Sequence, residues 1–480
     1  MAEKLLKFVS INRSMPDKRS ADDRREDFGE IYADFAAKSA QVQASRCSQC
    51  GVPFCQVHCP LNNNIPDWLK LTAEGRLEEA YEISAATNTF PEICGRICPQ
   101  DRLCEGNCVI EQSGHGTVTI GAIERHVTDT AFEKGWVQPV KPARELAQTV
   151  GIIGAGPAGL AAAEALRRKG YQVTIYDRYD RVGGLLIYGI PNFKLDKQVV
   201  ARREKLLRES GIHFQLNFEV GRDASLDELR QRHDALLIAT GVYKARDLAA
   251  PGSGSKGIVP ALQYLTAANR DGLGDKVVEI ANGELNAKDK NIVVIGGGDT
   301  AMDCVRTAIR QGAKSVKCLY RRDRANMPGS QREVNNAEEE GVEFIWQSSP
   351  SAFLDDDNGH VRAVRAERIH LGMVDATGRQ TPRIIEDSAF DLPADIVIKA
   401  LGFEPEDLPQ RLKAPALSIT KANTVRVNWR NLTTTIPGVF AAGDIVRGAS
   451  LVVWAIRDGR DAAAGIDAYL KENTRKAAAE

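Results

Sequence analysis

Residues 149–160 read TVGIIGAGPAGL, and this stretch decides the fold of the larger part of the chain. Its apolar start predicts a strand, and the alanine-rich segment that follows predicts a helix ending near Gly170. The turn between them has the spacing G-x-G-x-x-G, which is typical of a dinucleotide-binding βαβ unit. A second expected strand, YQVTIYD, ends on the acidic residue Asp177. The order of strand, turn, helix, strand and acid is much more specific than the glycines alone.

Each residue of this fingerprint has a mechanical use in holding a dinucleotide. Gly154 makes the tight turn, Gly156 lets the backbone approach a pyrophosphate, and Gly159 allows the helix to pack closely on the strand. The helix N-terminus favours the phosphate charge. Asp177 can accept a ribose hydroxyl, the alternative being an ordinary solvated acid at a strand end. The expected contacts of the first fold are Gly154, Gly156, Pro157, Ala158, Gly159 and Asp177.

Residues 291–302, NIVVIGGGDTAM, repeat the pattern in its G-x-G-x-x-A form. The strand that follows the expected helix, SVKCLYRRDR, carries Arg321 and Arg322 where the first fold has an acid. Arginines there suit a 2′-phosphate, which an acid would repel, although a solvated basic turn is the alternative. The second fold is therefore expected to bind NADPH in preference to NADH, and the first to bind an ADP moiety such as that of FAD. The expected NADPH contacts are Gly296, Gly298, Asp299, Thr300, Ala301, Arg321 and Arg322.

Eight of the ten cysteines crowd between positions 47 and 108. CSQCGVPFCQVHCP (47–60) has the spacing C-x2-C-x4-C-x3-C-P, and CGRICPQDRLCEGNC (94–108) has the spacing C-x3-C-P-x4-C-x3-C. The first run resembles that of bacterial ferredoxins, in which three cysteines hold one cluster and the fourth ligates the other. Two such runs predict two interleaved iron–sulfur clusters in a small helical domain. Zinc is the alternative, and disulfides are disfavoured because no export signal is visible.

The ferredoxin-like spacing predicts that the two cysteine runs exchange ligands. The expected ligands of the first cluster are Cys47, Cys50, Cys55 and Cys108. Those of the second are Cys59, Cys98, Cys104 and a fourth residue, for which Cys94 is the plain candidate. The segment 66–88 between the runs suits amphipathic helices that break near Gly75.

Charge and hydropathy exclude several classes of partner. The formal net charge of −1 gives no general attraction to nucleic acid or to an anionic membrane. No run of eighteen apolar residues occurs, so no membrane span is expected. The first thirty residues have no long apolar core and become strongly charged, so no targeting segment is expected. The default expectation is a cytoplasmic protein that binds neither nucleic acid nor membrane.

Three further stretches carry a glycine after an expected strand: DALLIATG (234–241), ADIVIKALGF (394–403) and TTTIPGVFAAGDIVRG (433–448), the last with Gly443 and Asp444. With the two fingerprints, they resemble the flavoprotein disulfide reductase superfamily over about residues 148–470. The resemblance implies FAD in the first fold and an NADPH domain inserted within the FAD domain. It also implies flavin-side contacts at Gly183, Gly184, Leu185, Thr240, Gly241, Gly443 and Asp444, the glycine pair at 183–184 being otherwise a simple turn. Neither nucleotide domain has a C-x-x-C pair, so disulfide exchange is not expected, and Cys304 and Cys318 are interpreted as core residues.

With the cysteine segment included, nearly the whole chain resembles the family of NADPH-dependent glutamate synthase small (β) subunits. The distinctive matches are the two cysteine runs, GGLLIYGIPNFKLDK (183–197) and YRRDRANMPGS (320–330). Relatives by the same resemblance are the N-terminal part of dihydropyrimidine dehydrogenase and the large subunit of NADH-dependent ferredoxin:NADP oxidoreductase. In these relatives a Gln or Glu completes the flavin-side cluster. The matching residue here is Glu124, which competes with Cys94 as the fourth ligand and is otherwise a capping or surface carboxylate.

The resemblance implies an electron-input subunit. NADPH gives up two electrons as a hydride, a 4Fe–4S cluster accepts one at a time, and a flavin can do both, so no catalytic side chain is expected. The expected partner is a large (α) subunit that carries glutaminase and FMN sites and makes L-glutamate from L-glutamine and 2-oxoglutarate, in a hetero-oligomer. The alternatives are a pyrimidine-reducing or ferredoxin-linked complex and a zinc-stapled NADPH-binding scaffold.

The expected fold class is α/β, with two Rossmann-like dinucleotide-binding domains preceded by a helical domain that holds two clusters. The chain of 480 residues is long enough for two or three domains. The expected units are a helical iron–sulfur domain at 1–147, FAD-binding parts at 148–285 and 401–480, and an NADPH-binding domain at 286–400.

Overall fold

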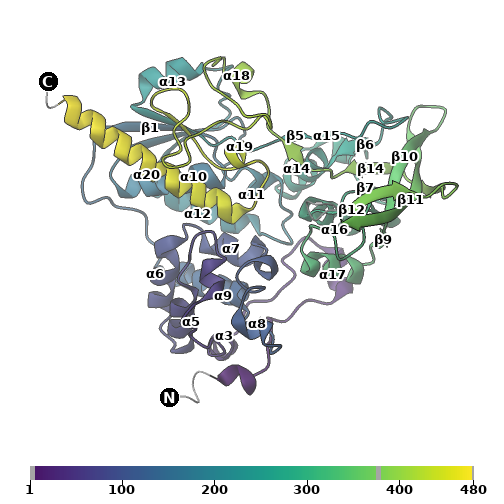
Figure 1. Cartoon of the computed structure of the whole chain (residues 1–480), viewed down its shortest axis with the longest axis horizontal. Helices are drawn as coiled ribbons and strands as arrows, with labels where there is room; N and C mark the ends of the chain where they lie inside the picture. The colour runs from purple at the N-terminus through teal and green to yellow at the C-terminus, as the bar shows by residue number, and fades with distance from the viewer. Residues whose placement is uncertain (1–5, 375–379, 478–480) are drawn as a thin grey trace.

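The computed structural model describes residues 6–374 and 380–477. A helical unit, at the bottom of Figure 1, holds the cysteine-rich segment. Its main helices are α3 (Ala37–Ala44), α5 (Ile65–Ala73), α6 (Leu77–Thr87), α7 (Pro91–Ile97) and α9 (Ile120–Glu133). Trp68, Leu69, Ile123 and Val127 belong to the buried core that these helices share. The cysteine loops cover this core together with the short helices α4 (Phe54–Val57) and α8 (Val109–Gln112).

The expected break near Gly75 is confirmed. Helix α5 ends at Ala73, Gly75 has φ of 80°, and α6 begins at Leu77. A left-handed residue directly after a helix ends it, and glycine takes that conformation without steric cost.

The first fingerprint opens a five-stranded sheet in the order β16-β4-β1-β2-β3, all of whose pairs are parallel. The strands are β1 (Thr149–Ile153), β2 (Gln172–Tyr176), β3 (His213–Gln215), β4 (Ala235–Ile238) and β16 (Val439–Ala441). Helices α10 (Pro157–Arg168), α12 (Lys197–Glu209) and α20 (Val452–Ala477) pack beside it (Figure 1). The central strands are apolar throughout because helices cover both faces of a parallel sheet.

The second fingerprint opens another parallel sheet, in the order β6-β14-β7-β8-β9. The strands are β6 (Ile258–Pro260), β7 (Asn291–Ile295), β8 (Ser315–Leu319), β9 (Glu343–Ile345) and β14 (Ile396–Lys399). Their main helices are α14 (Ala261–Gly272), α16 (Asp299–Arg310) and α17 (Gln331–Glu339). Because β16 returns to the first sheet after β14, the second unit is inserted in the first, and the expected α/β fold is confirmed.

The expected boundary between residues 285 and 286 needs a correction. Strand β6 pairs with β14, so the second unit begins near residue 258, about thirty residues before its fingerprint. The three-residue strand follows the turn-rich stretch PGSGSKG and has no periodicity of its own. Two short strands, β5 (Lys244–Ala245) and β15 (Phe403–Glu404), pair where the chain crosses between the units.

An antiparallel sheet stands beside the second unit and was not predicted. It consists of β10 (Ser348–Asp355), β11 (Val361–Val374), β12 (Gln380–Ile384) and β13 (Phe390–Pro393). Phe353, Val364 and Leu392 pack against Val293 and Leu319 of the parallel sheet. The sheet therefore covers one face of the second unit (Figure 1).

The N-terminal strap, defined here as residues 16–32, precedes the helical unit. It contains α2 (Ala21–Glu26), which contacts α16 of the second unit and is purple beside α17 in Figure 1. Among the described helices, none combines the length and the hydropathy that crossing a membrane requires.

Candidate functional site

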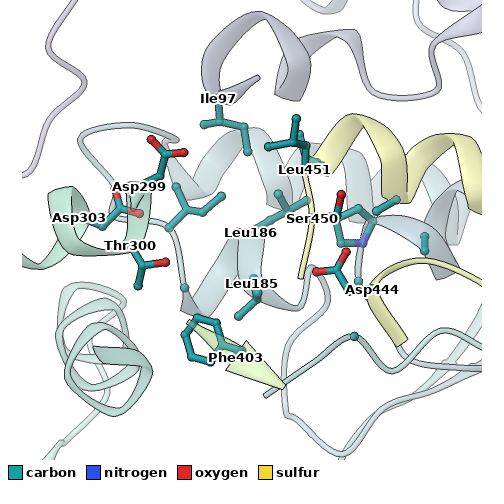
Figure 2. Close-up of a pocket in the computed structure, with 18 of the residues that line it drawn as sticks. Ile97, Leu185, Leu186, Asp299, Thr300, Asp303, Phe403, Asp444, Ser450 and Leu451 are labelled. Atoms are coloured by element: carbon teal, nitrogen blue, oxygen red, sulfur yellow. The ribbon is translucent and has the colours of Figure 1, made fainter. Parts of the chain in front are cut away.

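A cavity of about 270 Å³ lies where the two nucleotide-binding units and the helical unit meet (Figure 2). Figure 2 shows Asp299, Thr300 and Asp303 of α16 on one side and Asp444, Ser450 and Leu451 on the other. The predicted site residues that line it are Gly154, Gly156, Pro157, Ala158, Asp177, Leu185, Thr240, Gly241, Asp299, Thr300, Asp444 and Cys98. One space thus joins both fingerprints to the second cysteine run.

The three glycines of the first fingerprint differ in whether the fold itself requires a glycine at that position. Gly154 has φ of 114°, and a Cβ atom there would lie 2.4 Å from the Ala239 carbonyl oxygen. A Cβ at Gly159 would lie 2.1 Å from the carbonyl oxygen of Gly154. Both glycines are therefore required by the fold itself. A Cβ at Gly156 would meet no atom within 4 Å, so the chain alone does not demand this glycine.

Asp177, directly after β2, holds the loop of the first fingerprint as well as facing the cavity. Its Oδ2 accepts a hydrogen bond of 2.6 Å from the Ala155 N–H, and its Oδ1 accepts one of 2.8 Å from the Tyr179 N–H. Burial raises the pKa of this carboxyl group, while the two N–H donors act in the opposite direction. Each carboxylate oxygen keeps a further lone pair for a ribose hydroxyl.

Two more observations fit a polar ligand in the first unit. The Thr240 Oγ1 is buried without a hydrogen-bond partner in the described part of the chain, although Thr240 lines the cavity. Buried hydroxyl groups are normally satisfied, so a ligand is a natural partner. Helix α20 begins at Val452, and Leu451, Val452 and Ala455 line the same cavity. Its positive N-terminal end therefore lies beside the space.

Gly443 and Asp444 begin α19 (Asp444–Arg447) at the cavity wall. Gly443 has φ of 77°, and a Cβ there would lie 2.9 Å from the Cβ of Ala158 in the first fingerprint. Burial raises the pKa of Asp444 to about 6. The pair thus brings a half-buried carboxyl group next to the first fingerprint.

The second fingerprint repeats the geometry of the first. Gly296 has φ of 149°, and a Cβ there would lie 2.3 Å from the Ala400 carbonyl oxygen. Gly298, like Gly156, has nothing within 4 Å of its Cβ position. Ala301 is fully buried against the sheet. The Asp299 carboxylate accepts hydrogen bonds from the Ser330 N–H (2.9 Å) and Arg102 (3.2 Å).

Arg321 and Arg322 follow β8, away from the central cavity. Within the described residues neither has an ion-pair partner, and the buried Nε of Arg322 has no hydrogen-bond partner. The nearby Arg324 is already paired, because its Nη1 lies 2.7 Å from the Glu338 carboxylate. Two uncommitted guanidinium groups at this strand end fit a 2′-phosphate.

The eight crowded thiols fall into two neighbourhoods. Burial and, to a smaller extent, the neighbouring thiols raise the pKa of Cys47 to about 11 and that of Cys55 to about 12. The first neighbourhood comprises Cys47, Cys50, Cys55 and Cys108. The second comprises Cys59, Cys94, Cys98 and Cys104 together with Glu124. A set of thiols is the donor chemistry that iron–sulfur clusters require, and the assignment of ligands stays a prediction.

The described His, Cys, Asp and Glu side chains include no group of three or more arranged to hold a single metal ion.

Glu124 and Cys94 both lie in the second neighbourhood. Glu124 of α9 is buried, its Oε1 accepts hydrogen bonds from Asn88 (3.1 Å) and Ser84 (3.4 Å), and burial raises its pKa to about 8. The Cys94 thiol of α7 is within 3.8 Å of the Asn88 Oδ1, to which it donates. Asn88 therefore contacts both candidates for the fourth ligand, and the choice between them stays a prediction.

Iron analysis of two variants tests which residue is the fourth ligand. We expect Cys94→Ala to keep the full iron and acid-labile sulfide of the unaltered protein, because the thiol already has a partner. We expect Glu124→Ala to lose about half of both, because one of the two predicted clusters would lose a ligand. The opposite pattern would assign the position to Cys94.

Two lysines that support the cavity wall were not predicted from the sequence. Lys197 is buried, and its Nζ donates to the carbonyl oxygens of Leu186 (3.0 Å) and Ile190. It thereby fixes α11 (Leu185–Tyr188) over the cavity, and burial lowers its pKa to about 7. The Lys194 Nζ lies 2.8 Å from Asp303 and crosses from the first unit to the second. Both lysines occur in the quoted stretch 183–197, but nothing in their spacing marks them as buried.

The glycine pair before α11 forms a turn that packs on the first fingerprint. Gly183 has φ of 124° and Gly184 φ of 56°. A Cβ at Gly184 would lie 3.0 Å from the Gly156 Cα. The pair is thus required by the approach of two backbones, which leaves close stacking of a nicotinamide as a prediction.

Comparison with known proteins gives matches for every unit. Residues 24–136 match the family described as dihydropyrimidine dehydrogenase domain II, 4Fe-4S cluster, and residues 148–459 match pyridine nucleotide-disulphide oxidoreductase. The chain is 69% identical over 469 residues to the glutamate synthase (NADPH) small chain of Azospirillum brasilense, covering 98% of this chain and 97% of that protein. It is 44% identical over 475 residues to the protein of the same name from Escherichia coli K12, covering 98% and 100%.

Among solved structures, Mycobacterium tuberculosis FprA in complex with NADPH shares the fold. The TM-score is 0.58 at 18% sequence identity, over 70% of this chain and 86% of that one.

Proposed function

Because this chain belongs to the family of NADPH-dependent glutamate synthase small chains, we propose that it is the electron-input subunit of such an enzyme. In this proposal FAD binds the unit formed by residues 148–257 and 401–480, and NADPH binds the inserted unit of residues 258–400. The helical unit holds two 4Fe–4S clusters through the two thiol neighbourhoods. When bound, the flavin accepts a hydride from NADPH and passes electrons singly to the clusters.

One observation carries the proposal. Cys98 and Pro99 of the helical unit line the same cavity as Gly156 and Thr240 of the first nucleotide-binding unit. A flavin whose phosphates lie on the first fingerprint would therefore have its reactive ring near the second thiol neighbourhood. A short path between these centres is what an electron-input subunit needs.

The chain's own residues supply positioning and polarity. The Gly156 and Gly298 backbones admit the two pyrophosphates, since no other part of the chain approaches their Cβ positions. Asp177 holds the first loop in shape through Ala155, and Lys197 holds the wall formed by α11. No side-chain nucleophile or general base is required.

The partner in this proposal is a large chain with glutaminase and FMN sites, which makes L-glutamate from L-glutamine and 2-oxoglutarate. Purifying the chain alone and with the co-expressed large chain tests it. The chain alone should oxidise NADPH with an artificial electron acceptor but not with glutamine and 2-oxoglutarate. The complex should oxidise NADPH only when both substrates are present. Oxidation that instead depends on a pyrimidine or on ferredoxin would favour the alternative complexes.

Arg322→Ala tests the nucleotide assignment. We expect the Kd for NADPH to rise about 10- to 100-fold, because a charge-assisted contact to the 2′-phosphate is lost. The Kd for NADH should change by less than about twofold. Arg324→Ala is the matched control, because that side chain is already paired with Glu338. Equal weakening of both nucleotides in Arg322→Ala would remove the assignment.

A further inference from the structure

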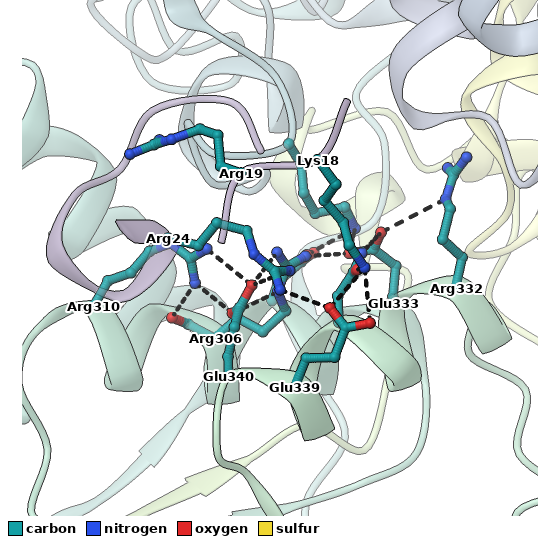
Figure 3. Close-up of polar contacts among 12 residues, drawn as sticks. Lys18, Arg19, Arg24, Arg306, Arg310, Arg332, Glu333, Glu339 and Glu340 are labelled. Carbon is teal, nitrogen blue, oxygen red and sulfur yellow. Dashed lines mark hydrogen bonds and ion pairs between the residues drawn. The ribbon is translucent and has the colours of Figure 1, made fainter. Parts of the chain in front are cut away.

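The N-terminal strap contacts the second nucleotide-binding unit through a buried arginine. Arg24 of α2 is 1% exposed, with its Nη1 3.2 Å from the Glu340 Oε1 and its Nη2 2.6 Å from the Glu339 Oε2 (Figure 3). The Lys18 Nζ adds a contact of 2.6 Å to Glu339. A buried guanidinium group needs charged partners, so Arg24 fixes the place where the strap contacts the second unit.

The anchor continues as a network of charges to the cavity. Glu340 also binds Arg306 (2.8 Å) and Arg310 (2.6 Å) of α16, and Arg306 lies 2.5 Å from Glu333. Glu333 is 3.9 Å from the Lys194 Nζ, and it lines the cavity together with Lys194. Strap, second unit and cavity wall are therefore joined by consecutive ion pairs (Figure 3).

The strap also contacts the first nucleotide-binding unit. Asn192 Nδ2 donates to the Phe28 carbonyl oxygen over 3.0 Å, and the rings of Phe28 and Phe193 lie 6.4 Å apart. Glu30 accepts a hydrogen bond of 3.0 Å from the Asp196 N–H. Asn192, Phe193 and Asp196 belong to the segment 183–197, which forms one wall of the cavity.

The helical unit is the third partner of the strap. The Glu30 carboxylate lies 2.8 Å from Arg96 of α7 and 3.1 Å from Arg125 of α9. Glu30 thus joins the helical unit to the first unit, while Arg24, six positions earlier, binds the second.

We propose that the strap fixes the second nucleotide-binding unit at the orientation in which its nucleotide reaches the flavin, with Arg24 as the positioning residue. This inference rests on the proposed function. The chain crosses between the two units at only two places, near the short pair β5–β15, and units joined in this way can rotate about the crossing. Positioning matters because small displacements of reacting groups cost large factors in rate.

Arg24→Ala removes the buried anchor of the strap and leaves the rest of the ion-pair network in place. Glu340 keeps Arg306 and Arg310 as partners, so its charge stays compensated and the second unit should fold. We expect the rate of flavin reduction by NADPH, measured by anaerobic stopped flow, to fall at least about 10-fold. The Kd for NADPH should stay within about twofold, and Arg24→Lys should recover part of the rate.

Arg25→Ala is the matched control, because Arg25 is the exposed neighbour on the same helix. It should reduce the flavin at the rate of the unaltered protein. Trypsin should cut the strap of Arg24→Ala faster than that of the control. A released strap with an unchanged rate of flavin reduction would overturn the proposal.

Glu339→Gln gives a second route if Arg24→Ala does not retain flavin. Glu339 is half-exposed and binds both Lys18 and Arg24. Removing its charge therefore weakens the contact of the strap with the second unit without changing a buried residue. A slower flavin reduction with unchanged Kd supports the proposal, and an unchanged rate counts against it. Failure of NADPH to reduce the flavin of the unaltered protein would instead overturn the proposed function.

Discussion

Replacing Cys59 by serine is expected to stop the transfer of electrons from NADPH to the large chain while NADPH still reduces the flavin. Cys59 lies in the second thiol neighbourhood with Cys98, which lines the cavity. Loss of a residue that only supports a metal ligand already costs about 10–100-fold in affinity, so loss of a ligand should lower partner-linked activity at least 100-fold. The first neighbourhood keeps its own thiols, so about half of the iron should remain.

Three measurements check this expectation. Iron and acid-labile sulfide report the clusters, stopped-flow bleaching of the flavin by NADPH reports the first step, and glutamate formation by the complex reports the last. Cys304→Ala is the control, because Cys304 is buried in the core of the second unit and away from both thiol neighbourhoods. Its iron content and activity should equal those of the unaltered protein. Full activity in Cys59→Ser would end the assignment of Cys59.

Gly156→Ala and Gly298→Ala form a matched pair, because each is expected to weaken the binding of a different nucleotide. Neither added methyl group meets another part of the chain, and both residues have negative φ, so both variants should fold. Each glycine precedes a helix, where alanine caps less well, so the free energy of unfolding without ligand should fall by no more than about 1 kcal/mol. The methyl group should instead occupy the place of an approaching pyrophosphate.

We expect Gly156→Ala to weaken FAD binding at least about 100-fold, so that the purified protein is nearly colourless at the flavin bands. Gly298→Ala should keep its FAD and lose affinity for NADPH by a similar factor. Flavin content and NADPH titration of the two variants measure both effects. If Gly156→Ala retained FAD, the first fingerprint would not hold its pyrophosphate.

Gly159→Ala distinguishes a glycine that the fold requires from one that only the expected ligand requires. Its Cβ would lie 2.1 Å from the Gly154 carbonyl oxygen, so this variant should lose stability even without ligand. The contrast with Gly156→Ala tests the separate roles that the fingerprint assigns to the two glycines, helix–strand packing for Gly159 and approach to the pyrophosphate for Gly156.

Features that depend on residues close together in the chain could be predicted from the amino-acid sequence. The turns at Gly154 and Gly296 and the helix that follows each are local requirements of short range, and spacing therefore revealed them. The same holds for the break at Gly75 and for the crowding of eight thiols in one segment. Family resemblance then supplied what these local patterns bind.

Contacts between segments that are distant in the chain became known only from the folded structure. Strand β6 joins the second sheet through β14, almost 140 positions later, and no local pattern specifies that partner. Arg24 pairs with Glu340, which lies 316 positions later in the chain. From the sequence alone, Arg24 cannot be distinguished from a solvent-exposed arginine on a helix. Spacing carries information only about residues that share an element, whereas strand partners and buried ion pairs are fixed by the packing of the whole chain.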